Sequence, residues 1–374
     1  MNLRAHSICQ FRPLGSQSAL KLLAAIMLSL SMAAIVNAQP ATSQPAEKKA
    51  EAEDKKKSDK WDIEKLYDDS KAVEFNLTEG TWMNLDVSPD GKSIIFDLLG
   101  DIYTLPIAGG QAKCISSGLA YEVQPRFSPD GAWVSYTSDK GGADNIWLMR
   151  PDGSESHQVT KESFRLLNNA CWTPDGQYLI ARKHFTSSRS LGAGEMWMYP
   201  VSGGPGLKLT SRKNQQQDAG EPCVSADGKF LYWSEDVSPG GSYDYNRDPN
   251  GVIYAIRQLD MKTGEISNLI RKPGGAVRPT VSADGKHMAY VRRIRSRTAL
   301  MLRDLATNVD RVLTDSLSKD GQETWSIFGV YSNFAFTPDS KSVVYWAHGK
   351  INKVELSDSS KKIIPFAATS KHNI

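Results

Sequence analysis

The sequence predicts an all-β fold, namely a six-bladed β-propeller of four-stranded antiparallel blades that follows a signal peptide and a disordered linker. Three observations predict it. A Ser/Thr-Pro/Ala-Asp-Gly/Ser motif recurs six times, apolar residues alternate on both sides of every copy, and the region lacks a sustained helical period. Four strands for each of six repeats is the arrangement expected of a six-bladed propeller.

The composition is ordinary for a globular protein, with 374 residues of which 40% are hydrophobic and 23% charged. A net charge of +3 is too small to indicate nucleic acid or an anionic membrane as a partner. Cys9 lies in the predicted signal, so Cys114, Cys171 and Cys223 remain, an odd number that does not form a disulfide framework. We expect these three to be small core residues.

Residues 1–38 are typical of a signal peptide. Arg4, Arg12 and Lys21 form a basic leader, residues 22–36 are apolar or small, and residues 36–38 (Val-Asn-Ala) offer a cleavage site. An uncleaved membrane anchor is the alternative, but an apolar core of 15 residues is short for a bilayer of roughly 30 Å. We therefore expect a periplasmic or secreted protein with no stable membrane span after cleavage.

Residues 39–72 are predicted to be a flexible charged linker. The first two thirds of this segment hold Pro, Ala, Ser and dense mixed charge, with almost nothing to bury. Such a composition does not offset the entropy lost on ordering.

The repeat itself occupies residues 73–366. Its Pro presets φ, its Asp binds its own backbone and its Gly tolerates positive φ, so each copy predicts a tight turn between two strands. Third and fourth strands follow each hairpin. The copies lie 40 to 57 residues apart and begin at Ser88, Ser128, Thr173, Ser225, Ser282 and Thr337.

The repeat region contains one more predicted fourth strand than it has blades. Residues 73–78 resemble a fourth strand before the first blade, and residues 362–366 supply a fourth strand to the last blade. That makes seven fourth strands for six blades, so either the spare strand is displaced or a parent chain continued into more blades. Residues 367–374 are interpreted as a tail without strand character, and we favour a truncated chain.

Polar residues recur four positions before each Ser or Thr, on the strand expected to line the channel. They predict a ring at one channel mouth that binds a ligand. The alternative is that they satisfy backbone groups at strand starts. The six residues are Asn84, Gln124, Asn169, Glu221, Arg278 and Asn333.

Segments that interrupt the repeat are the other candidates, because long loops on a rigid scaffold often carry binding residues. Arg182, His184 and Arg189 fall in a long connection predicted inside the third blade, where they could grip an anion or a carboxylate. Arg165 and Trp325 lie in the segments before the third and sixth blades. The alternative for these charges is a solvated hairpin.

A complete catalytic set is not found. The histidines after the signal form no His-x-His or His-Glu-x-x-His pair, and the Gly-x-Ser-x-Gly, Gly-x-Gly-x-x-Gly and P-loop patterns are missing. We therefore predict no catalytic residue, no metal and no cofactor. A carbohydrate-active or lactonase-like enzyme would need paired channel acids, and the ring offers only Glu221.

The repeats resemble the PD40 (WD40-like) repeats of the TolB family of periplasmic propellers over residues 74–366. Five interrupted segments look like the N-terminal propeller of large exported amidohydrolases: residues 79–86, 164–169, 182–185, 274–279 and 322–325. In that family a metal-dependent, imidazolonepropionase-like hydrolase domain lies further along the chain. This sequence stops at Ile374, and the family's metal ligands have no counterpart in it.

The leading hypothesis is a non-catalytic periplasmic propeller that acts as a binding or protein-interaction module. The alternative is the propeller half of a two-domain amidohydrolase, which shapes access to a hydrolase site that this chain lacks. The expected partner is accordingly a separate protein or the missing hydrolase domain.

Overall fold

The computed structural model describes residues 62–66, 69–163, 166–186, 192–241 and 247–374. All regular secondary structure among these residues is strand, which confirms the all-β prediction. The predicted signal peptide and most of the predicted linker lie outside the described residues. None of the described residues forms a helix long and apolar enough to cross a membrane.

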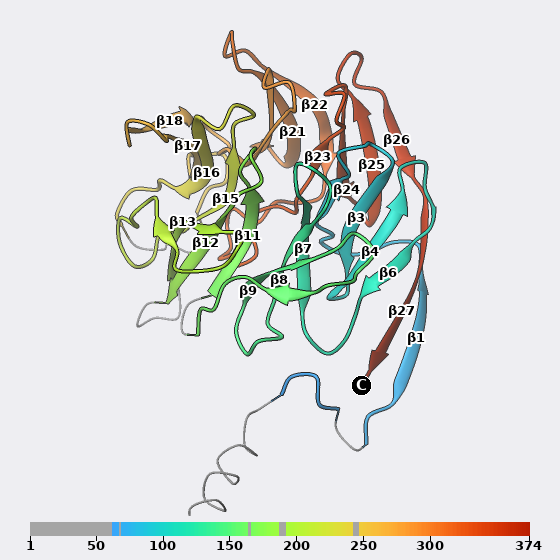
Figure 1. Cartoon of the computed structure of the whole chain (residues 1–374). Helices are drawn as coiled ribbons and strands as arrows, with labels where there is room; N and C mark the ends of the chain where they lie inside the picture. Colours follow the sequence, from blue (N-terminus) through green and yellow to red (C-terminus); the bar gives the residue numbers. More distant parts are fainter. Residues whose placement is uncertain (1–61, 67–68, 164–165, 187–191, 242–246) are drawn as a thin grey trace, which may run out of the picture. The chain divides into compact units, whose positions relative to one another are not determined.

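Six four-stranded antiparallel sheets follow one another along the chain (Figure 1). The first sheet contains β2 (Leu85–Val87), β3 (Ser93–Leu98), β4 (Asp101–Pro106) and β6 (Lys113–Ser116). The second contains β7 (Glu122–Phe127), β8 (Val134–Ser138), β9 (Asn145–Met149) and β10 (His157–Gln158). The third contains β11 (Leu166–Trp172), β12 (Tyr178–Thr186), β13 (Gly192–Pro200) and β14 (Leu207–Lys208).

The remaining sheets repeat this order. The fourth contains β15 (Ala219–Val224), β16 (Phe230–Asp236), β17 (Tyr254–Asp260) and β18 (Ile266–Ile270). The fifth contains β19 (Val277–Val281), β20 (His287–Ile294), β21 (Arg297–Asp304) and β22 (Asp310–Leu317). The sixth contains β23 (Ala335–Phe336), β24 (Ser342–Ala347), β25 (Lys350–Glu355) and β26 (Lys361–Ile364).

The first strands of the sheets contact one another in cyclic order. β2 contacts β7, which contacts β11, and the series continues through β15 and β19 to β23, which contacts β2 again. This arrangement is consistent with a β-propeller, in which the first strand of each blade lines the central channel.

The repeated motif forms the tight turn that its residues predict. In the first copy Ser88 Oγ donates to Asp90 Oδ1 over 2.6 Å, and Ser93 N donates back to Ser88 Oγ over 2.9 Å. Gly91 N donates to Ser88 O over 2.8 Å, and Gly91 adopts a φ of 72°. The hydrogen bond from Ser88 lowers the pKa of Asp90. The serine, the aspartate and the glycine of the motif therefore each have a defined role in closing the hairpin.

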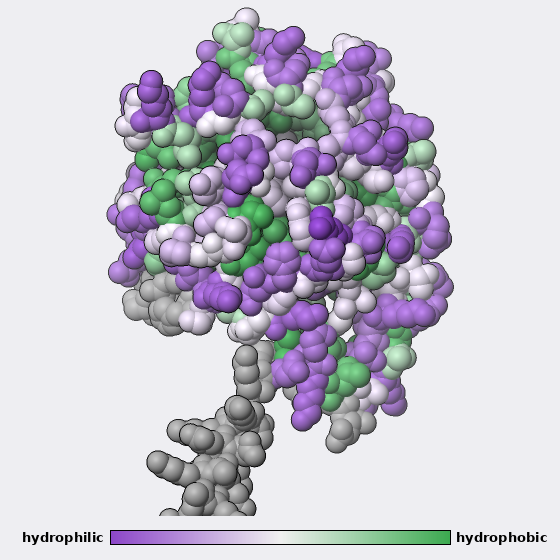
Figure 2. All heavy atoms as spheres, in the orientation of Figure 1, coloured by the Kyte–Doolittle hydropathy of each residue, from purple (hydrophilic) through white to green (hydrophobic). Residues whose placement is uncertain are grey.

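The core lies between neighbouring sheets. The apolar residue six positions after the start of each motif is fully buried in all six repeats, as the alternation predicts. These residues are Ile94, Val134, Leu179, Leu231, Met288 and Val343. Figure 2 shows polar and charged side chains over most of the visible face, with small hydrophobic patches between them.

The two ends of the described region form a separate ribbon. β1 (Ala72–Leu77) pairs antiparallel with β27 (Phe366–Asn373), which also pairs with β5 (Gly110–Gln111). The interpretation of residues 367–374 as a tail without strand character was therefore wrong. The spare strand is displaced, because β1 pairs with β27 while β6 is the fourth strand of the first sheet. Phe366 anchors β27 against Phe96, with ring centroids 5.4 Å apart.

Candidate functional site

The structure brings the six predicted ring residues together. We call them the first ring: Asn84, Gln124, Asn169, Glu221, Arg278 and Asn333. Four of them lie on the first strands β7, β11, β15 and β19, and the other two precede β2 and β23. Each is at most 3% exposed. The first ring is therefore a buried polar layer.

The backbone bulges where the ring residues lie on strands. Gln124, Asn169, Glu221 and Arg278 have φ between 54° and 61°, and the strand register shifts at each of them. This left-handed conformation is strained for residues other than glycine. In three of these bulges the residue's N–H donates to the preceding sheet: Gln124 N to Asp97 Oδ2, Asn169 N to Gln124 Oε1 and Arg278 N to Glu221 Oε2, each over 2.8 Å. Hydrogen bonds between sheets therefore offset the strain.

Asp97 on β3 completes this set, although the sequence pattern did not indicate it. Its Oδ1 accepts from Asn84 N over 2.7 Å, and its Oδ2 accepts from Asn84 Nδ2 over 2.7 Å and from Gln124 N over 2.8 Å. Burial raises the pKa of Asp97 to about 6, while these hydrogen bonds oppose the rise. Asp97 therefore joins the first two sheets at the ring.

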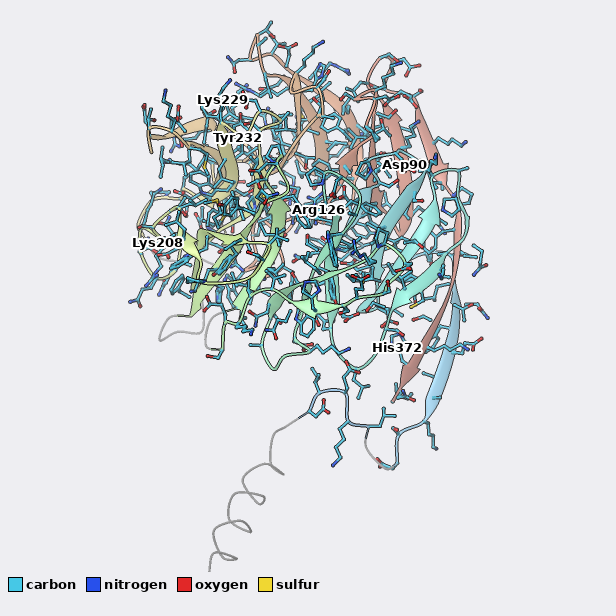
Figure 3. All side chains as sticks on the ribbon, viewed as in Figure 1. Asp90, Arg126, Lys208, Lys229, Tyr232 and His372 are labelled. Carbon is cyan, nitrogen blue, oxygen red and sulfur yellow. The ribbon has the colours of Figure 1, made fainter. Side chains whose placement is uncertain are left out.

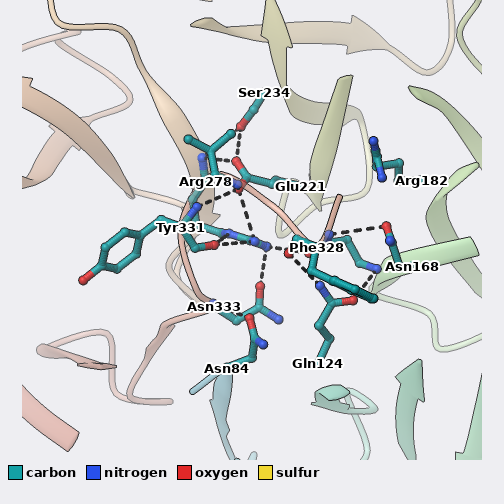
Figure 4. A network of polar contacts seen from close by, with 12 residues as sticks. Asn84, Gln124, Asn168, Arg182, Glu221, Ser234, Arg278, Phe328, Tyr331 and Asn333 are labelled. Carbon is teal, nitrogen blue, oxygen red and sulfur yellow. Dashed lines mark hydrogen bonds and ion pairs between the residues drawn. The ribbon is translucent and has the colours of Figure 1, made fainter. Parts of the chain in front are cut away.

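The ion pair between Arg278 and Glu221 lies at the centre of the ring (Figure 4). Arg278 Nη2 is 3.2 Å from Glu221 Oε1, and both side chains are buried. Arg278 also donates to Asn169 Oδ1 over 2.9 Å and to Asn333 Oδ1. Burial lowers the pKa of Arg278 to about 10 and the charge of Glu221 opposes that fall, so the guanidinium stays charged at neutral pH.

A segment of the chain itself fills this end of the channel. We call residues 325–331 the plug. Three side chains donate to its main chain: Gln124 Nε2 to Phe328 O over 2.8 Å, Asn168 Nδ2 to Ile327 O over 2.9 Å, and Arg182 Nη1 to Ile327 O over 2.7 Å. Figure 4 shows the contact of Gln124 with Phe328, with Asn168 and Arg182 on the same side of the plug.

The ion pair holds the other half of the plug. Glu221 Oε1 accepts from Val330 N over 2.6 Å and from Tyr331 N over 3.2 Å, and Arg278 Nε donates to Tyr331 O over 2.8 Å. Gly329 adopts a φ of 108°, and a Cβ at this position would clash with Arg278 Nη2. Glycine is therefore required where the plug crosses the ion pair.

Glu221 has no oxygen left for acid–base catalysis in this conformation. Its Oε2 accepts from Ser234 Oγ over 2.5 Å and from Arg278 N, while its Oε1 accepts from the plug. The part of the chain that the structure describes also contains no group of three or more His, Cys, Asp or Glu residues placed to hold a metal ion.

Two of the predicted loop candidates are strand residues. Arg182 and His184 lie on β12 and are each 1% exposed, so their placement in a connecting loop was wrong, and the alternative of solvated charges does not hold for these two residues either. The reason is that β12 and β13 form a long hairpin that continues past the ring. Arg182 Nη2 lies 2.6 Å from Asp218 Oδ1, and burial raises the pKa of Asp218 while the Arg182 charge opposes the rise.

Trp325 belongs to the plug, and its ring lies 5.4 Å from the His184 ring. Arg182 donates to the plug as well, so the structure brings Arg182, His184 and Trp325 to the first ring. The other two candidates, Arg165 and Arg189, lie outside the described residues.

A second ring lies two positions further along the same strands, and the fixed offset within each repeat is the sequence signal that could have found it. Its residues are Asp86, Arg126, Cys171, Cys223, Thr280 and Ala335. They line a cavity of 450 Å³, which we call the funnel, together with residues of the motif turns. Cys171 and Cys223 are therefore cavity residues, and burial raises the pKa of both thiols.

These features together define a β-propeller whose channel is plugged at one end and hollow at the other. Residues 38–184 match the family described as the TolB beta propeller domain, PD40. This part of the chain is therefore similar to the TolB-like propeller family, in agreement with the resemblance of the repeats. The comparisons do not support the resemblance to amidohydrolases.

Two relatives illustrate the extent of the sequence match. An uncharacterised protein of Agrobacterium fabrum is 35% identical over 81 residues, which cover 21% of this chain and 28% of that protein. The Tol-Pal system protein TolB of Helicobacter hepaticus is 26% identical over 160 residues, which cover 42% of this chain and 37% of that protein. The chain spans between 11% and 37% of the length of four curated relatives that it matches.

Solved structures show the same fold. TolB from Acinetobacter baumannii superposes with a TM-score of 0.57 at 17% identity, covering 77% of this chain and 65% of that chain. The tricorn protease superposes with a TM-score of 0.52 at 11% identity, covering 81% of this chain and 36% of that chain. At these identities the likeness concerns the fold alone.

Proposed function

We propose that this chain is a six-bladed, TolB-like propeller that acts as a non-catalytic protein-interaction module in the periplasm or outside the cell. The observation that supports this function is the way the first ring holds polypeptide. Side chains from the second to the fifth sheets bind main-chain atoms of the plug. Main-chain hydrogen bonds are a general mode of protein recognition, since they require no particular sequence in the bound segment.

The plug and its rim form the surface proposed to contact the partner. Tyr121 is 47% exposed, and its ring lies 5.5 Å from the ring of Phe328 in an edge-on contact. Trp325 lies on the same plug and is half-buried. Aromatic side chains with one exposed face are enriched in the centres of protein interfaces. The first ring then acts by positioning the plug beneath this surface.

The test compares two exposed tyrosines. Tyr121→Ala removes the proposed contact, whereas Tyr178→Ala removes a side chain that is 39% exposed at the start of β12, beside a motif turn. Proteins cross-linked to the tagged chain in its source cells would be quantified by mass spectrometry. We expect Tyr121→Ala to reduce recovery of the main partner about tenfold and Tyr178→Ala to leave it unchanged.

Equal recovery with both variants would contradict the proposed surface, and the absence of any reproducible partner of the unaltered chain would contradict the proposed function. Thermal unfolding of both variants serves as the control for folding. If Tyr121→Ala has the same thermal unfolding midpoint as the unaltered chain, the reduced recovery of the partner results from the altered surface and not from misfolding.

A second candidate function is that of the propeller half of a larger metal-dependent hydrolase, where it would shape access to the active site. Its support is that similar regions occur within longer chains, since this chain covers 36% of the tricorn protease and 11% of a tricorn protease homologue of Streptomyces coelicolor. The metal dependence rests on the resemblance to amidohydrolases alone. The intact mass of the native protein, with sequencing past the codon for Ile374, tests it. A larger mass with a downstream His-x-His would support this candidate, and the mass of residues 39–374 would contradict it.

A further inference from the structure

The second ring contains a guanidinium group with unused hydrogen-bonding capacity. Arg126 lies on β7, and its side chain is 15% exposed. The distance from its Nη1 to Asp86 Oδ1 is 3.7 Å, which is longer than a hydrogen bond. None of its guanidinium nitrogens has a hydrogen-bond acceptor among the described residues, and Figure 3 labels it near the middle of the sheets.

The fully buried arginines of this chain lie much closer to their acceptors than the partly buried Arg126 lies to Asp86. Arg182 Nη2 lies 2.6 Å from Asp218 Oδ1, and Arg278 Nε donates to Tyr331 O over 2.8 Å. Arg293 donates to both oxygens of Asp320 over 2.9 Å. A guanidinium removed from water normally requires such acceptors. The fold therefore supplies these three arginines with hydrogen-bond acceptors but supplies none to Arg126 among the described residues.

Asp86 does not supply the missing acceptor, because the main chain holds it in place. Its Oδ1 accepts from Val87 N over 3.0 Å and its Oδ2 accepts from Phe127 N over 2.9 Å. To rotate toward Arg126, the carboxylate would have to give up these bonds. The guanidinium therefore remains available to a group that enters the funnel.

The funnel has the size and lining of a small-molecule site. Its 450 Å³ lies within the roughly 300–1,000 Å³ typical of ligand pockets. Apart from Arg126 and Asp86, the walls are mainly apolar, and Thr280 adds a hydroxyl oxygen that has no hydrogen-bond partner in the described part of the chain. The apolar wall residues include Pro89, Phe127, Trp172, Pro174, Val281 and Phe336.

We propose that the funnel binds a small organic monoanion, an apolar group that carries one carboxylate, with the carboxylate on Arg126. The planar guanidinium offers paired N–H donors that match the two oxygens of a carboxylate. A single negative charge is favoured because the nearby Asp86 carboxylate would repel a second one. The site lies at the opposite end of the channel from the plug, so it is independent of the proposed function.

The experiment uses 4-phenylbutyrate as the probe and isothermal titration calorimetry as the measurement. We expect saturable binding of the acid, and binding about 10- to 100-fold weaker for the uncharged 4-phenylbutyramide. Arg126→Leu should weaken binding of the acid by a similar factor. Asp86→Asn should strengthen it several-fold, because the repelling charge is removed. Lys208→Leu, which removes a charge from the outer strand β14, should leave the affinity unchanged.

Arg126→Lys keeps the positive charge but lacks the paired donors. Its affinity for 4-phenylbutyrate should lie between the affinities of the unaltered chain and of Arg126→Leu. This intermediate affinity supports the site even if Arg126→Leu folds poorly. The peptide Ala-Ala-Phe with a free or an amidated carboxyl end separates the two sources of the carboxylate. Tighter binding of the free peptide than of 4-phenylbutyrate assigns the site to a chain terminus, and the reverse assigns it to a free acid. Equal affinity of the unaltered chain and Arg126→Leu, or no saturable binding of either carboxylate, would overturn the proposal.

Discussion

The two rings of the channel lie two residues apart on the same strands, yet they differ in composition and in what fills them. The first ring has six polar side chains, and the chain's own plug occupies it. The second ring combines Asp86 and Arg126 with Cys171, Cys223, Thr280 and Ala335, and it opens into the funnel. One ring therefore closes the channel, while the other lines a cavity.

The difference shows how polar content decides whether a channel end stays open. Buried polar groups must find hydrogen-bond partners, so a ring of amides and charges requires a segment rich in donors and acceptors. The main chain of the plug provides both, since the carbonyls of Ile327 and Phe328 accept hydrogen bonds. The N–H groups of Val330 and Tyr331 donate to Glu221. The second ring has fewer polar groups and so requires fewer partners, and it is left without a covering segment among the described residues.

The largest expected loss of stability comes from removing the negative charge of Glu221 in the first ring. Glu221→Gln would place an amide group against N–H donors and leave Arg278 as a buried charge without its partner. We expect a loss of about 3–5 kcal/mol in the free energy of unfolding, measured by denaturant titration. Thr280→Val in the second ring is the matched comparison, because it removes a hydroxyl without a partner and should change stability by less than about 0.5 kcal/mol. Similar losses in both variants would refute the contrast between the rings.

The second-largest expected loss of stability comes from a substitution in the plug. Gly329→Ala would place a Cβ against Arg278 Nη2, so either the plug or the ion pair must move. We expect a loss of about 3 kcal/mol, from the clash and from the backbone strain at positive φ. Gly240→Ala isolates the backbone contribution, because Gly240 has a φ of 95° and a Cβ added there would have no atom within 4 Å. It should cost only about 1 kcal/mol. Equal costs would show that the plug tolerates a side chain there.

The smallest expected effect is a change of the free energy of unfolding with pH, which Asp97 beside the first ring produces. Burial raises its pKa from 3.8 to about 6, so its contribution to stability is complete below the unfolded value and is lost as the pH rises through 6. We expect this loss to be at most about 3 kcal/mol between pH 4 and 7, and Asp97→Asn to remove it.

Unfolding free energies measured across that pH range check the assignment. Asp90 in a motif turn provides the opposite sign, because its hydrogen bond from Ser88 lowers its pKa, so its contribution is lost as the pH falls. If the free energy of unfolding of Asp97→Asn depends on pH as strongly as that of the unaltered chain, other carboxyl groups produce this dependence. Asp101 and Asp144 are the groups to vary next, since burial raises their pKa values to about 7 and about 6.

Much of the fold followed from the sequence because its signals are local. The motif at Ser88 and its copies specify turns through contacts between residues that are at most five positions apart. Alternating apolar residues then specify the buried face of each strand. The strand β27 was missed because residues 367–374 have weak apolar alternation, and their pairing with β1 joins residues that are nearly 300 positions apart.

The sequence alone determined the repeat, the turns and the identity of the six first-ring residues, because each follows from a fixed offset within one repeat. The tertiary structure alone decided what those residues do. Gln124, Glu221 and Arg278 meet the plug only because separate sheets converge on one channel. Likewise, the isolation of Arg126 depends on how the main chain holds Asp86 in a neighbouring sheet. Hydrogen bonds and ion pairs between distant residues have no periodic signal in the sequence, so they emerge only when the sheets are packed together.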